Sequence, residues 1–115
     1  MKTEFRDTRL GQSQPVRVEF TRYLDGGAIA VELVCAEEKS FGEPWMTATV
    51  NVPGIPEGCV AVKDYSEGEG LPELLCSAGI IEAVPVRHIR SGYVSIPVFR
   101  LTAGALHALE KVRAE

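Results

Sequence analysis

The sequence predicts an α+β fold: a mostly antiparallel sheet of about five to six strands, with two helices. Apolar residues alternate with polar ones in paired runs near both ends of the chain, and glycine turns separate the runs of each pair, which indicates hairpins. Apolar residues with helical spacing occur after the "KDYSE" turn and again at the C-terminus. Hairpins at both ends leave little room for regular βαβ units, and 115 residues suit a single domain, 1–115.

The first hairpin is predicted from strands over 16–21 and 29–35. Valine and phenylalanine alternate with polar residues in the first run, and apolar residues alternate again in the second. Asp25, Gly26 and Gly27 lie between the runs and tolerate the positive φ of a tight turn.

The middle of the chain predicts two more strands, over 45–52 and 59–65. Pro53 and Pro56 separate them, because proline has no amide hydrogen to give to a ladder. Trp45 begins the first of these strands as either a partly buried core residue or an exposed interface anchor.

A capping box predicts where the first helix begins, since Ser66 and Glu69 have the Ser-x-x-Glu spacing. The helix is expected to end at Gly79, which adopts the left-handed conformation without a Cβ penalty. Between these points the apolar residues fall on one helical face: Leu71, Leu74, Leu75 and Ala78.

The second hairpin is predicted over 84–101, turning about Arg90, Ser91 and Gly92. Pro85 and Pro97 indicate that this hairpin lies partly at a sheet edge or begins its strands at these prolines. A final helix is expected after Thr102 as its cap, and its apolar face comprises Ala105, Leu106, Leu109 and Val112.

Gly68 and Gly70, between a strand and a helix, invite comparison with a phosphate-binding loop. The third glycine of a dinucleotide fingerprint and the Lys-Ser/Thr pair of a P-loop are both missing. Asp64, Glu67 and Glu69 would also place like charges around a phosphate. The segment is therefore not expected to bind phosphate.

Cysteine and histidine give no chemical motif. Three widely spaced cysteines predict reduced, small core residues, because their number and spacing fit neither a disulfide framework nor a CxxC half-site. His88 and His107 do not pair with a cysteine at zinc-ligand spacing. No catalytic residue, metal or cofactor is therefore predicted.

Charge is unevenly distributed along the chain, whose net charge is −4. The segment 57–82 contains six acids and one lysine, whereas residues 83–115 contain five basic residues and two acids. In the acidic part, the candidates for contact with a partner are Asp64, Tyr65 and Glu67. In the basic part they are Arg87, Arg90 and Tyr93 around the second turn. The alternative is that these charges form two solvated faces.

The start of the chain is polar and has no secretory pattern, and no apolar run reaches about 18 residues, so a cytoplasmic protein without a membrane partner is expected. The oligomeric state is not predicted.

The chain resembles the domain-of-unknown-function family 4313, short proteins of bacterial mobile genetic elements, in three elements of its C-terminal half. These are the "KDYSEGEG" run at 63–70, the Ala78-Gly79 helix end and the "SGYVSIPV" hairpin at 91–98. Where the family often shows asparagine, this chain has Gly68, which is expected to loosen the loop. The resemblance implies a setting on a phage or conjugative element, with no assigned activity.

The leading hypothesis is a small, acidic, non-enzymatic protein-binding factor of a mobile genetic element. The resemblance and the acidic segment together suggest an anti-CRISPR-like inhibitor that covers a basic surface of a host defence nucleoprotein complex. The first alternative is a nucleic-acid-binding regulatory protein that uses Arg87 and Arg90, although an acidic chain makes direct nucleic-acid binding the less favoured interpretation. The second alternative is an uncharacterised small enzyme.

Overall fold

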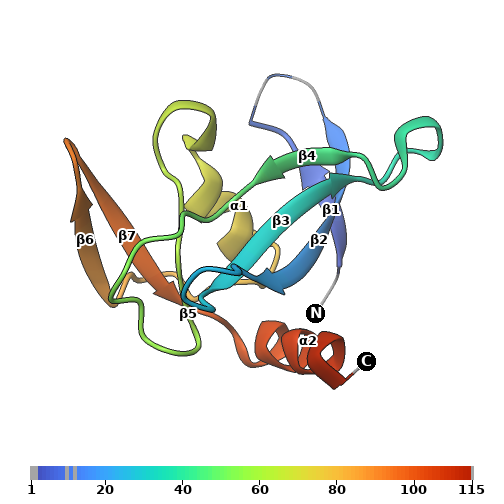
Figure 1. Ribbon diagram of the computed structural model, residues 1–115. Helices are drawn as coiled ribbons and strands as arrows, with labels where there is room; N and C mark the ends of the chain where they lie inside the picture. The colour runs from blue at the N-terminus through green and yellow to red at the C-terminus, as the bar shows by residue number, and fades with distance from the viewer. Residues whose placement is uncertain (1–2, 10, 12, 115) are drawn as a thin grey trace.

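A computed structural model describes residues 3–9, 11 and 13–114, with side chains as far as residue 111. Strands and two α-helices alternate with irregular segments, which confirms the α+β class (Figure 1). The described strands are β1 Glu4–Asp7, β2 Gln14–Arg22, β3 Ile29–Cys35, β4 Pro44–Thr47, β5 Cys59–Ala61, β6 Arg87–Ser91 and β7 Val94–Arg100. The helices are α1 Leu71–Ser77 and α2 Ala103–Ala114, with single 3-10 turns η1 Glu38–Ser40 and η2 Ser66–Gly68.

The strands form two antiparallel sheets, where the sequence predicted one. The first sheet has the order β1-β2-β3-β4 and contains the predicted first hairpin, in which Val16 pairs with Cys35 and Arg22 with Ile29. Its edge strand β1 was not predicted, because Phe5 is the only large apolar side chain among its four residues.

The division into two sheets follows from where β4 ends. The predicted strand 45–52 is in the sheet only as far as Thr47. Beyond it the chain crosses toward the second sheet and pairs through a single bridge between Thr49 and Val62. The buried Thr49 hydroxyl accepts a hydrogen bond from the Val31 amide at 3.2 Å and lies 2.9 Å from the Tyr23 hydroxyl. Thr49 thus connects the two sheets.

The second sheet has the order β5-β7-β6, so the predicted second hairpin supplies its centre and one edge. The turn lies one residue later than predicted, since Ser91 pairs with Val94 across Gly92 and Tyr93. Strand β6 is at the edge of this sheet, which confirms that the hairpin lies partly at a sheet edge, while Pro97 itself lies in the central strand β7. It is tolerated there because β5 has ended: Val62 donates to the Pro97 carbonyl at 3.0 Å, in the irregular segment after β5.

The first helix begins later than the capping box predicted. Ser66 opens η2 with a left-handed φ of 52°, and α1 starts at Leu71 after Gly70, whose φ is 82°. Neither Ser66 nor Glu69 caps a helix through its side chain. The predicted end is confirmed, because Gly79 is left-handed with φ of 78°.

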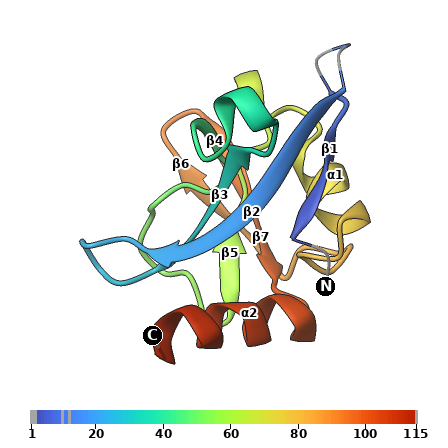
Figure 2. The same cartoon turned by 90° about the vertical axis from the view of Figure 1, so that its right-hand side faces the viewer.

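The C-terminal helix begins as predicted. The Thr102 hydroxyl accepts a hydrogen bond from the Ala105 amide at 3.2 Å and therefore caps α2. Figure 2 shows α2 lying across one end of the molecule, beneath both sheets. Ala105 and Leu109 of α2 are buried in the main core.

The core consists of two clusters. The larger lies between the four-stranded sheet, α1 and α2, and includes the fully buried Leu33, Leu71 and Leu75. The smaller lies on the other face of the second sheet, where Cys59, Ala61, Ile96 and Val98 are buried. Across the described part of the chain, no helix has the length and apolar character needed to cross a membrane.

Candidate functional site

The acidic turn, residues 63–69, connects β5 to α1 and is tightly folded. The Gly68 amide donates to the Tyr65 carbonyl at 2.8 Å, and the Glu69 amide donates to the Ser66 carbonyl at 3.1 Å. A Cβ added at Gly68 would lie 2.5 Å from the carbonyl oxygen of Lys63. The expectation that Gly68 loosens this loop is therefore wrong: glycine is what allows the chain to approach itself so closely.

An arginine from the N-terminal segment holds the acidic turn in place. The Arg9 guanidinium donates to the Glu67 carbonyl at 2.7 Å and to the Glu69 carbonyl at 3.1 Å. These bonds join residues 58 and 60 positions apart in the sequence. The shape of the acidic turn therefore depends on a tertiary contact and not on its own residues alone.

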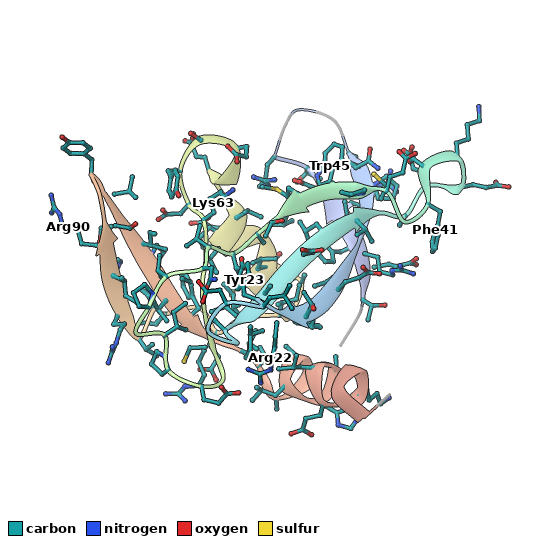
Figure 3. The ribbon with its side chains drawn as sticks, in the orientation of Figure 1. Arg22, Tyr23, Phe41, Trp45, Lys63 and Arg90 are labelled. Carbon is teal, nitrogen blue, oxygen red and sulfur yellow. The ribbon has the colours of Figure 1, made fainter. Side chains whose placement is uncertain are left out.

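Asp7 and Trp45 orient this arginine. Asp7 is 1% exposed, and both of its carboxylate oxygens accept hydrogen bonds from the Arg9 guanidinium, at 2.8 and 2.9 Å. The Trp45 indole N–H donates to the same carboxylate at 2.9 Å. We call Asp7, Arg9 and Trp45 the Arg9 cluster; Trp45 is labelled in Figure 3. Its indole is half-buried and serves an internal polar contact.

Burial raises the pKa of Asp7, but the hydrogen bonds from Arg9 and Trp45 and the charge of Arg9 outweigh it, so that the pKa lies below its ordinary value. A depressed carboxyl pKa stabilises the folded state at pH values above the unfolded pKa of about 3.9. This contribution is lost as the pH falls through the lower, folded pKa. We therefore expect the free energy of unfolding to decrease as the pH is lowered below about 4.

Urea denaturation between pH 2 and 7 measures this dependence, with the Asp7→Asn variant as the control because its amide does not titrate in this range. The stability of the variant should decline less steeply between pH 4 and pH 2 than that of the wild type. Parallel curves for the two proteins would contradict the assignment.

The three acidic-turn candidates differ in how far the fold already uses them. Asp64 is exposed. Tyr65 is half-buried and packs against the smaller core cluster, so its ring is partly committed to the fold. Glu67 is exposed but forms an ion pair with Lys63 at 3.1 Å, an internal use that the sequence analysis did not find. A backbone hydrogen bond within Glu67 and this contact with Lys63 lower its pKa.

The basic candidates lie on the hairpin formed by β6 and β7. Arg87 and Arg90 are exposed on β6, and the Arg87 guanidinium has one weak contact, 3.4 Å from the Gly54 carbonyl. Tyr93 occupies the turn and is fully exposed. Figure 3 shows Arg90 near the far end of the hairpin, directed away from the body of the molecule. This hairpin is the part of the fold that extends farthest from the four-stranded sheet (Figure 1).

A groove of about 560 Å³ joins the acidic turn to the hairpin. Asp64 lies on its acidic side, with Glu73 of α1, and His88 of β6 lies on the hairpin side. Between them the lining is mostly apolar and rich in proline: Pro72, Cys76, Ala83, Pro85, Pro97 and Phe99 with Ser77. Of the six candidate residues only Asp64 lines this groove, and Arg87, Arg90 and Tyr93 lie on the hairpin outside its lining.

The Arg9 cluster was not predicted, because the N-terminal segment is mostly polar and mixed in charge in the sequence. Asp7 and Arg9 are opposite charges two residues apart, but Arg9 lies in the turn beyond the end of β1, so a strand pattern does not pair them. Cys35 and Cys59 are buried, as predicted for small core residues, and Cys76 is half-buried. In the described residues, no three or more histidine, cysteine, aspartate or glutamate side chains gather as potential metal ligands.

Comparison with protein-family models, with curated proteins and with solved structures returns no match for this chain. The resemblance to the domain-of-unknown-function family 4313 therefore stays a prediction.

Proposed function

We propose that this protein acts by binding another protein, without catalysis, through the region formed by the β6–β7 hairpin and the acidic turn. One observation carries the proposal. Among the described residues, five large apolar side chains are exposed, and three of them lie in the hairpin or the segment that enters it: Val84, Val86 and Tyr93. Val84 and Val86 precede β6 and Tyr93 follows it, so exposed apolar side chains flank both ends of this strand. Exposed apolar side chains are a feature of protein-interaction sites.

Charge around this region favours a protein partner over a nucleic acid. Arg87 and Arg90 are exposed on the hairpin, whereas Asp64 and Glu73 line the groove between the acidic turn and His88. A protein surface carries both signs of charge and matches such a mixed region.

The resemblance and the acidic segment support a more specific proposal, an inhibitor of a host defence complex encoded on a phage or conjugative element. In this proposal the acidic turn contacts a basic surface of the complex through Asp64, which is exposed, whereas Glu67 is paired with Lys63. The test is target-DNA cleavage by purified CRISPR nucleoprotein complexes of host bacteria with this protein in excess. Unchanged cleavage by every complex tested would remove the inhibitor proposal and leave the broader one standing.

Photo-crosslinking tests protein binding at the hairpin directly. A photoreactive amino acid at Tyr93 should give a discrete crosslinked band with a protein of the native host, whereas the same amino acid at Leu24 should not. Leu24 is the matched control because it is also fully exposed and lies at the turn of the other hairpin, between β2 and β3. The band should be lost when Arg87 and Arg90 are both changed to glutamate.

Equal crosslinking from both positions, or none from Tyr93, would contradict the proposal. The nucleic-acid alternative is tested in the same samples, because single-stranded or duplex DNA should then displace the crosslink at low salt and fail to do so at high salt.

A further inference from the structure

The outer edge of β6 is an unpaired backbone edge of the second sheet. The sheet order β5-β7-β6 leaves β6 with a neighbour on one side only. The opposite boundary is covered, because the Val50 amide donates to the Ala61 carbonyl at 3.0 Å and the Lys63 amide donates to the Ala48 carbonyl at 2.9 Å. Among the described residues of this sheet, β6 is thus the strand open to pairing.

The register identifies which backbone groups face outward. In an antiparallel strand, the N–H and C=O of one residue point to the same side, and successive residues alternate. The Pro97 carbonyl accepts from Val62, so Pro97 turns its backbone toward the β5 side. His88 pairs with Pro97, and Arg90 pairs with Ser95 in the same phase. The amide and carbonyl of His88 and Arg90 therefore point to the outer edge.

The side chains along the outer edge of β6 determine which charge a strand that pairs with it should carry. Arg87, His88 and Arg90 are all exposed, and a strand added to β6 would lie about 5 Å away. Pairing with a second copy of β6 would bring arginines close to arginines, which is destabilising. An acidic strand would place its carboxylates beside them.

The outward groups also select a polypeptide. His88 and Arg90 together present two N–H donors and two C=O acceptors, the alternation that a β-strand matches. Phosphate oxygens only accept hydrogen bonds, so a nucleic-acid backbone bound through its phosphates would leave both carbonyls to water.

We propose that the outer edge of β6 binds an extended acidic segment of a partner protein, which adds to the second sheet as a fourth strand. This inference rests on the proposed function and names the chemistry of its partner. The main-chain hydrogen bonds of His88 and Arg90 supply the pairing, and Arg87 and Arg90 supply the preference for acidic side chains. Tyr93, at the turn, lies at the end of the same edge.

Proline substitution tests the backbone part of the inference. His88→Pro removes the outward amide while leaving the bonds between β6 and β7 intact, because the His88 amide does not face β7. His88→Ala is the matched control, since it removes the same side chain and keeps the amide. Peptides of eight residues selected from a random display library against the wild-type protein serve as the probe.

The selected peptides should be rich in aspartate, glutamate and β-branched residues. Their affinity should fall roughly tenfold or more for His88→Pro and change less than threefold for His88→Ala. Neutral or basic selected peptides, no enrichment over an unrelated bait, or equal affinities for the two variants would each overturn the inference. Displacement of the peptides by oligonucleotides would favour a nucleic acid and would also overturn it.

Amide hydrogen exchange gives a second measurement that needs no variant to fold. In the free protein the Ile89 amide, which faces β7, should exchange slowly, and those of His88 and Arg90 should exchange fast. A saturating concentration of the selected peptide should slow hydrogen exchange at the His88 and Arg90 amides. A Tyr93 crosslink that persists in His88→Pro would show that protein binding stands while strand addition fails.

Discussion

Replacing Asp7 with alanine is expected to lower the free energy of unfolding by about 3 to 4 kcal/mol. The substitution leaves the guanidinium of Arg9 largely buried without its carboxylate, and breaking a buried ion pair in this way costs about 3 to 5 kcal/mol. It also removes the acceptor of the Trp45 indole N–H. Urea denaturation at pH 7 measures the loss.

Glu19→Ala is the matched control, because it also removes the acid of an arginine–carboxylate pair. The Arg17–Glu19 pair is of similar length, 2.7 Å, but the Glu19 side chain is 48% exposed. Its loss should cost less than about 1 kcal/mol. Equal effects of the two substitutions would show that burial of the Arg9 cluster does not determine its contribution.

Asp7→Ala should also loosen the acidic turn, which is more than 55 residues away in the sequence. Without its carboxylate partner, Arg9 is no longer fixed beneath the Glu67 and Glu69 carbonyls. We expect faster hydrogen exchange at the Gly68 and Glu69 amides in this variant under conditions where the protein remains folded. Unchanged exchange at both amides would mean that the turn keeps its shape by itself.

Gly68→Ala is expected to destabilise the protein by about 2 kcal/mol, although alanine normally favours folding through its lower backbone entropy in the unfolded chain. The added methyl group would lie 2.5 Å from the Lys63 carbonyl oxygen and 2.7 Å from the Lys63 Cγ. A backbone atom cannot move aside as a flexible side chain does, so the acidic turn must open. Thermal or urea denaturation measures the change.

Glu69→Ala provides the comparison for this variant. It lies in the same turn, its side chain is exposed, and Arg9 contacts only its carbonyl. The change in stability should stay within about 0.5 kcal/mol. A Gly68→Ala variant as stable as the wild type would indicate that the turn can accommodate the added methyl group without opening.

The features that the sequence predicted well depend on local chemistry. Gly79 ends α1 because of its own backbone freedom, and Thr102 caps α2 three residues before the amide that it accepts from. The first hairpin follows from alternation on two strands joined by a short glycine turn. Each of these signals lies within a few neighbouring residues, so it can be identified from one sequence without knowledge of tertiary contacts.

The failed predictions concern choices that distant residues decide. The Ser66–Glu69 capping box competes with an arginine 57 or more positions earlier, which bonds the carbonyls of this segment and fixes it as a turn outside the helix. The single predicted sheet divides into two where β4 ends at Thr47, which the alternation over 45–52 does not indicate. In the candidate site, exposure of Arg90 and Tyr93 followed from a turn sequence, whereas the partial burial of Tyr65 depends on the second core cluster.

The contacts of Arg9 bear on the order in which the protein folds. Hairpins and helices form from residues close in the chain, whereas joining Arg9 to the Glu69 carbonyl must close a loop of 60 residues. The acidic turn therefore reaches its final shape only after the N-terminal strand has docked. During synthesis, the β2–β3 hairpin would be complete well before the acidic turn is made. The acidic turn would therefore be able to bind a partner only at the end of folding.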